Sequence, residues 1–199
     1  MIQQCPCELI SWSTVNKLAH DLAVKIRKAG FHPDVVVAIA RGGYVPARLL
    51  CDYLDLTDLS SIRIVHYVAA ACKKKKAELV ERLNRDLRGK RVLLVDDVSD
   101  TGDTLELGRS HMEEQGTAVL RTAVLHHKQT SFIVPDFFGR RIIKWRWIIY
   151  PWAVIEDAAG LIERLPHRPA DAGEAVLRLQ QDYGLRVRRS LVEEILAMK

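Results

Sequence analysis

Apolar residues recur at three- and four-residue spacing between residues 11 and 30, which predicts an amphipathic helix with one buried stripe. The stripe is formed by Val15, Leu18, Ala19, Leu22 and Ile26. The pattern then changes, because residues 35–40 are all apolar and largely β-branched. A short continuous run of this kind is typical of a strand that is buried on both faces. The first predicted elements are thus a helix and a central strand.

The alternation of helical and strand patterns continues along the chain. Further strands are predicted at residues 62–68, 92–95, 118–125 and 142–150. Further helices are predicted at residues 46–54, 78–87 and 104–115. Strands that alternate with helices in this way are typical of an α/β fold, in which helices cover both faces of a central, mostly parallel sheet.

Two more helical patterns, at residues 171–183 and 189–198, follow the prolines near residue 169 and predict a helical C-terminal tail. A length of 199 residues fits one domain with a short appendage. We therefore expect a domain over residues 1–165 and a helical C-terminal extension over residues 166–199, whose role stays open.

The net charge of +5 first suggests a polyanionic partner such as nucleic acid. Four consecutive lysines, Lys73 to Lys76, supply four of these five charges, so the excess is confined to one short segment. Nucleic acid is therefore not the expected partner. The lysine segment is either part of a catalytic loop that holds a small anion or a solvated run of charge.

Neither an export signal nor an apolar stretch long enough to span a membrane is recognisable, so we expect a cytoplasmic protein with reduced thiols and no membrane partner. Cys5 and Cys7 are too closely spaced for the usual zinc pattern, and no suitable pair of cysteine or histidine residues follows them. The function of these two thiols stays open.

Residues 92–105 are the segment with the most informative chemistry. Asp96 and Asp97 follow four apolar residues, which places both carboxylates at the carboxyl end of a strand, where ligands of open α/β sheets bind. A turn with Thr101 and Gly102 comes next, and backbone N–H groups at the start of the following helix favour a phosphate. Adjacent carboxylates repel one another unless a cation or hydroxyl groups satisfy them. The segment therefore predicts a phosphate site beside a site for a sugar diol or Mg²⁺.

A second turn with anion-binding character follows the first predicted strand. Arg41 supplies a positive charge, and Gly42 and Gly43 allow the backbone to approach an anion closely. An Arg-Gly-Gly turn is a weak signal alone, but its place after a buried strand and before the acidic segment favours a functional role.

Residues 92–105 resemble the phosphoribosyl pyrophosphate motif of the type I phosphoribosyltransferases, and the Arg41 turn resembles the pyrophosphate loop of that family. The resemblance extends from about Ser11 to Asp157 and is closest to the bacterial and archaeal xanthine/hypoxanthine/guanine branch. It implies a type I phosphoribosyltransferase-like fold, Mg²⁺ as cofactor, phosphoribosyl pyrophosphate and a purine base as substrates, and a homodimer or tetramer.

The resemblance also implies a role for individual residues. Asp96 and Asp97 would hold the ribose hydroxyls, partly through Mg²⁺, and Asp100 would act with them in catalysis by managing the N7 proton of a purine. The remaining residues that would bind the substrate's phosphates are Arg41, Gly42, Gly43, Thr101, Gly102, Asp103 and Thr104, together with Asp100. Family members often have Gly or Lys at the position of Asp103, which makes this acid the least secure of the set.

Base recognition is expected to come from two other segments. Lys128 resembles the family's lysine that meets the exocyclic O6 of the base. The aromatic segment that begins at Trp147 resembles the one in which a ring stacks on the purine while backbone near Ile148 reads its edge. Core packing of the tryptophans and a solvated Lys128 are the alternatives.

The expected reaction is transfer of ribose 5-phosphate from phosphoribosyl pyrophosphate to xanthine, hypoxanthine or guanine in purine salvage, with release of pyrophosphate. Two alternatives stay open: a regulator that senses phosphoribosyl pyrophosphate and binds nucleic acid, and transfer to a pyrimidine such as orotate or uracil. The Ser-Tyr pair that many hypoxanthine-guanine enzymes carry in a mobile loop is absent between residues 66 and 90.

Overall fold

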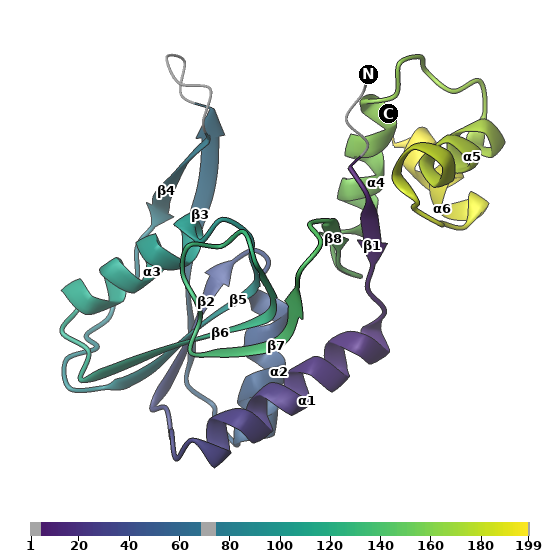
Figure 1. The fold of residues 1–199 in the computed structure, drawn as a ribbon. Helices are drawn as coiled ribbons and strands as arrows, with labels where there is room; N and C mark the ends of the chain where they lie inside the picture. Colours follow the sequence, from purple (N-terminus) through teal and green to yellow (C-terminus); the bar gives the residue numbers. More distant parts are fainter. Residues whose placement is uncertain (1–4, 69–74, 199) are drawn as a thin grey trace. The chain divides into compact units, whose positions relative to one another are not determined.

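A computed structural model describes residues 5–68 and 75–198 of the chain (Figure 1). These residues form two compact units. The larger unit comprises residues 15–144, and the smaller unit combines the described residues before 15 with those from 145 onward. Within the described ranges, no helix has both the length and the apolar character that crossing a bilayer requires.

The larger unit is built on a six-stranded sheet, counted over the described residues. In spatial order its strands are β4 (Lys75–Glu81), β3 (Leu59–Val68), β2 (Val35–Ala40), β5 (Arg91–Ser99), β6 (Val119–Lys128) and β7 (Phe137–Ile142). Neighbouring strands are parallel, except that β4 runs antiparallel to β3. Helices α1 (Trp12–Lys28) and α2 (Tyr44–Leu54) lie on one side of the sheet, and α3 (Asp103–Glu114) lies on the other (Figure 1). The predicted α/β fold is thus confirmed.

The centre of the sheet is buried on both faces, as the unbroken apolar runs predict. Every residue of β2 is buried, and so are the first apolar residues of β5. On the α3 side, Ile39 and Leu94 pack in one core cluster with Leu105 and Met112 of the helix. A Cβ added at Gly108 of α3 would lie 3.0 Å from Leu94 Cδ2, so this glycine lets the helix approach the sheet closely.

The smaller unit has a core of its own. Strand β1 (Cys7–Leu9) pairs in parallel with β8 (Trp147–Ile149), and helices α4 (Val154–Glu163), α5 (Ala172–Tyr183) and α6 (Arg189–Ala197) follow. Ile149 and Leu161 are buried in one cluster with Leu179 and Val192 from the last two helices. Both predicted C-terminal helices are therefore present and share the core of this unit. The division between a transferase-like domain and an extension at residue 166 stays a prediction.

Two predicted elements are wrong. Residues 78–87 were expected to form a helix, but residues 75–81 form β4, in which Leu79 pairs with Ile64 and Glu81 forms a 3.0 Å ion pair with Arg63. Pairing with β3 outweighs the local helical pattern here. The single strand expected at residues 142–150 is replaced by the end of β7 and by β8, with a break between them.

A buried histidine connects α3 to the segment after β4. His111 is 2% exposed, and its Nε2 accepts a hydrogen bond from the backbone N–H of Leu83 at 3.3 Å. Burial and the charge of Arg82 lower the pKa of His111, and Glu114 acts in the opposite direction. The folded chain therefore favours the neutral imidazole.

We expect His111 to lower the free energy of unfolding as the pH drops below about 6.5, the pKa of an unfolded histidine, whereas the raised pKa of Asp96 acts in the opposite direction. Below this pH the unfolded chain binds a proton at His111 that the folded chain does not bind until the pH is lower still. Chemical unfolding at about pH 8 and about pH 5.5 measures the effect. His111→Gln should lose less stability than the unmodified chain between these two pH values. Some pH dependence should remain, because burial also lowers the pKa of His127 and raises that of Asp96. An unchanged slope would contradict the assignment.

Candidate active site

The candidate segments of the larger unit lie at the carboxyl ends of three neighbouring strands. β2, β5 and β6 are adjacent and parallel, with Ala38 opposite Val95 and Asp96 opposite Val124. The Arg41 turn follows β2, the acidic segment forms the end of β5, and Lys128 ends β6. Because the carboxyl ends of parallel strands lie at one edge of a sheet, the fold brings these segments to the same edge.

Gly42 and Gly43 follow β2, and neighbouring atoms lie so close to both residues that there is no room for a Cβ atom. A cis peptide bond joins Ala40 to Arg41, and Gly42 and Gly43 follow. A Cβ at Gly43 would lie 2.6 Å from the backbone oxygen of Ile39 and would also clash with the backbone oxygen of Val95. A Cβ at Gly42 would collide with the carboxylate of Asp97, 2.7 Å from its Oδ1. The predicted pyrophosphate loop and the acidic pair are therefore in direct proximity.

The acidic pair lies within β5, which continues to Ser99 and does not stop at Asp96 as the pattern predicted. Asp96 is 8% exposed, and its Oδ1 accepts a hydrogen bond from the backbone N–H of Asp97 at 2.9 Å. Burial, and secondly the charge of Asp97, raise the pKa of Asp96 well above its usual value. A cation or a set of hydroxyl donors at this pair would stabilise its ionised form.

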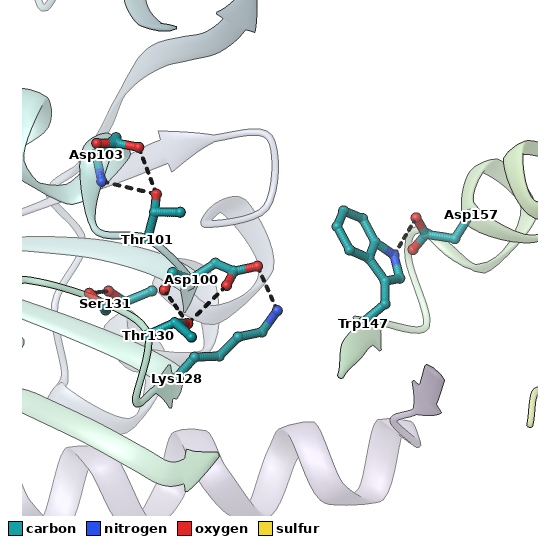
Figure 2. Close-up of polar contacts among 9 residues, drawn as sticks. Asp100, Thr101, Asp103, Lys128, Thr130, Ser131, Trp147 and Asp157 are labelled. Atoms are coloured by element: carbon teal, nitrogen blue, oxygen red, sulfur yellow. Dashed lines mark hydrogen bonds and ion pairs between the residues drawn. The ribbon is translucent and has the colours of Figure 1, made fainter. Parts of the chain in front are cut away.

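The turn between β5 and α3, the predicted phosphate site, leads directly into the helix through Gly102. Gly102 has a φ of 106° at the N-cap of α3, a conformation that favours glycine, and its carbonyl accepts the N–H of Glu106 at 2.9 Å. The hydroxyl of Thr101 donates to Asp103 Oδ2 at 2.7 Å (Figure 2). Asp103 thus directs its carboxylate to Thr101, and Thr104 lies in the first turn of the helix. The phosphate-binding roles of all four residues stay predictions.

Two of the predicted base-handling groups are in direct contact. Lys128 is only 2% exposed, and its Nζ forms an ion pair with Asp100 Oδ2 at 2.6 Å (Figure 2). The carbonyl oxygen of Asp100 accepts the hydroxyl of Thr130 at 2.9 Å, and Oδ1 of its carboxylate lies 3.3 Å from the same hydroxyl. The alternative of a solvated Lys128 is therefore wrong. Sequence reasoning missed Thr130, whose only signal is its position two residues after Lys128.

Trp147 and Ile148 belong to the smaller unit. Trp147 is 42% exposed, and its indole Nε1–H donates to Asp157 Oδ1 at 3.0 Å, whereas Ile148 is buried (Figure 2). Burial raises the pKa of Asp157, and the hydrogen bond from Trp147 partly offsets this effect. The indole is therefore held by a defined acceptor. Its stacking on a base and the backbone role at Ile148 stay predictions.

The donor set at the acidic pair fits Mg²⁺ only together with a substrate. Within the part of the chain that the structure describes, no group of three or more His, Cys, Asp or Glu side chains is placed to hold a metal. Asp96 and Asp97 supply carboxylate oxygens, and Mg²⁺ is commonly held by one or two carboxylates plus substrate phosphates. The predicted pair therefore suits a cation that arrives with a diphosphate.

The lysine segment, expected to be either part of a catalytic loop or a solvated run of charge, lies largely outside the described residues. Lys73 and Lys74 lie outside the described residues, and only the backbone of Lys75 and Lys76 is described, at the start of β4.

Cys5 and Cys7 both pack against the core of the smaller unit. Burial raises the pKa of the Cys7 thiol to about 12, which favours an inert side chain.

The model of the phosphoribosyl transferase domain family matches residues 11–157, about three quarters of the chain. The chain belongs to this family. It is 30% identical over 156 residues to the xanthine-guanine phosphoribosyltransferase of Desulfotalea psychrophila, covering 78% of this chain and 92% of that protein. The family resemblance is thus confirmed, and the protein is a phosphoribosyltransferase.

Solved structures of similar fold support the same family. A purine phosphoribosyltransferase from Pyrococcus horikoshii is 34% identical, with a TM-score of 0.65 over 73% of this chain and 93% of that one. A Neisseria gonorrhoeae protein with bound ppGpp is 28% identical, with a TM-score of 0.67 over 74% of this chain and 89% of that one. The first of these two structures is thus a named purine phosphoribosyltransferase, and the second is a protein of similar fold.

Proposed function

We propose that this phosphoribosyltransferase transfers ribose 5-phosphate from phosphoribosyl pyrophosphate to N9 of xanthine, hypoxanthine or guanine, as a step of purine salvage. The observation that carries this proposal is the 2.6 Å ion pair between Lys128 and Asp100 at the end of β6. A 6-oxopurine offers an O6 acceptor beside N7, so an ammonium donor next to a carboxylate acceptor matches that edge of the base.

The remaining groups at this edge of the sheet fit the proposed transfer. The bond from C1′ to the pyrophosphate oxygen breaks as the bond from N9 to C1′ forms, and the purine proton passes to Asp100. The ribose carries oxocarbenium-like positive charge during this exchange. Asp96 and Asp97 would hold the ribose hydroxyls beneath that charge, and Arg41 would stabilise the negative charge that develops on pyrophosphate.

The 5′-phosphate would bind the turn from Asp100 to Thr104, where backbone N–H groups begin α3. Asp96 and Asp97 would hold Mg²⁺ together with substrate oxygens, and the cation would supply charge neutralisation for the leaving pyrophosphate. A cytoplasmic location and assembly as a homodimer or tetramer belong to the proposal and are supported by the family alone.

Trp147 would stack on the purine, with its indole orientation fixed by Asp157. We expect Asp157→Leu to raise the Michaelis constant for the base several-fold, because the indole loses its acceptor, while the constant for phosphoribosyl pyrophosphate hardly changes. Asp157→Asn keeps an acceptor oxygen and should stay close to the unmodified enzyme. Steady-state kinetics with each substrate varied separately would measure this, and equal changes in both constants would contradict the assignment.

Pyrophosphate release tests the proposed reaction. The purified chain is incubated with Mg²⁺, phosphoribosyl pyrophosphate and one base at a time: xanthine, hypoxanthine, guanine, adenine, orotate or uracil. Turnover with one or more of the first three is expected. Activity with orotate or uracil alone would refute the purine assignment. Salt-dependent nucleic-acid binding without any turnover would favour the sensing alternative.

A further inference from the structure

The connection between β6 and β7 is attached to the turn that carries Asp100. Ser131 Oγ lies 2.7 Å from Ser99 Oγ, and the backbone N–H of Phe132 donates to the carbonyl oxygen of Thr101 at 2.9 Å. The N–H of Ser131 closes a turn onto the carbonyl oxygen of Lys128 at 3.0 Å. Residues 130–132, which we name the clamp segment, thus contact the side chain of Ser99 before Asp100 and the backbone of Thr101 after it.

Within the clamp segment, the hydroxyl of Thr130 reaches Asp100 itself. It lies 2.9 Å from the carbonyl oxygen and 3.3 Å from Oδ1 of the carboxylate, while Lys128 Nζ lies 2.6 Å from Oδ2 (Figure 2). The hydroxyl has a single proton, which it shares between the carbonyl oxygen and Oδ1, whereas Lys128 donates to Oδ2. The two groups therefore approach different oxygens of the carboxylate. A carboxylate held at both oxygens has less rotational freedom about its side-chain bonds than one held at a single oxygen.

We propose that Thr130 is a positioning residue for Asp100: its hydroxyl fixes the orientation in which the carboxylate receives the purine proton. The inference rests on the proposed function, because it assigns Thr130 a part in that reaction. Proton transfer requires donor and acceptor at hydrogen-bond distance and in line, so a rotated carboxylate transfers the proton less often. Lys128 cannot replace Thr130, since it approaches the other oxygen.

Thr130→Val removes the hydroxyl and keeps the shape of the side chain, whereas Thr130→Ser keeps the hydroxyl. We expect Thr130→Val to lower kcat roughly 5- to 30-fold, with little change in the Michaelis constant for phosphoribosyl pyrophosphate. Thr130→Ser should restore kcat.

A double-mutant cycle separates positioning from a purely structural role. If Thr130 acts through Asp100, Thr130→Val should have almost no further effect on kcat in an Asp100→Asn background. Equal losses in both backgrounds would overturn the inference. Ser131→Ala serves as the matched control, because it removes a neighbouring hydroxyl whose partners are Ser99 and Ile133. It should lower the melting temperature and leave kcat closer to that of the unmodified chain than Thr130→Val does.

The unmodified chain decides which proposal fails. If the unmodified chain turns over a 6-oxopurine and the Thr130→Val variant matches it in kcat, the positioning role is overturned and the proposed function remains. Absence of turnover in the unmodified chain with every 6-oxopurine would overturn the proposed function, and the inference about Thr130 with it.

Discussion

Asp100→Asn should lower kcat by roughly 10²- to 10⁴-fold, the usual range for loss of a general acid or base. The amide keeps the size of the side chain and accepts a hydrogen bond, but it cannot take up the purine proton. The Michaelis constant for phosphoribosyl pyrophosphate should hardly change, because the ribose acids and the backbone of the phosphate turn remain. Initial rates of pyrophosphate release with the preferred purine would measure both quantities.

Loss of folding must be separated from loss of chemistry in this variant. Lys128 is almost fully buried and would lose its charged partner, which costs roughly 1–3 kcal/mol of stability. Asp100→Asn combined with Lys128→Met removes both charges and should recover most of that stability, yet activity should not return. An Asp100→Asn enzyme that works at full speed would disprove the proton-transfer role.

The central strands and the phosphate turn could be predicted because their patterns are local. All residues of β2 are apolar, and burial on both faces leaves few other choices. The turn from Asp100 to Thr104 combines hydroxyls, a glycine and a helix start in one short stretch. This combination can be recognised in the sequence without knowledge of the fold. The predicted turn and helix start are confirmed, with Gly102 at the N-cap of α3 and a φ of 106°.

The elements that sequence reasoning missed depend on contacts between distant segments. β1 pairs with β8 although some 140 residues separate them, and three residues carry too little pattern to be recognised alone. β4 has charged residues in a helix-like arrangement, and only its register against β3 makes it a strand. Thr130 lies on a loop, and its contact with Asp100 can be recognised only once the fold is known.

Gly42→Ala should reduce kcat/KM for phosphoribosyl pyrophosphate by roughly 10²-fold, because a displacement of about 1 Å at a reacting group costs this much. The added Cβ would collide with the Asp97 carboxylate, which can move only by leaving its position in the predicted ribose site. Since the obstacle is a side chain, stability should fall by no more than about 1 kcal/mol. Kinetics with phosphoribosyl pyrophosphate varied, together with chemical unfolding, would test both expectations.

Gly43→Ala and Gly160→Ala provide the contrast that makes this test decisive. At Gly43 the added Cβ meets the backbone oxygens of Ile39 and Val95, which cannot move aside, so about 1–3 kcal/mol of stability should be lost. Gly160 lies within α4 with nothing within 4 Å of the added Cβ, so its replacement should stabilise the helix by up to about 1 kcal/mol. A loss of stability in Gly42→Ala equal to that in Gly43→Ala, or full activity as in Gly160→Ala, would contradict the prediction. The close approach of Gly42 to Asp97 would then not be needed for activity. Of these three variants, low activity with nearly unchanged stability is expected for Gly42→Ala alone, because only there does the added Cβ collide with a side chain that is predicted to bind substrate.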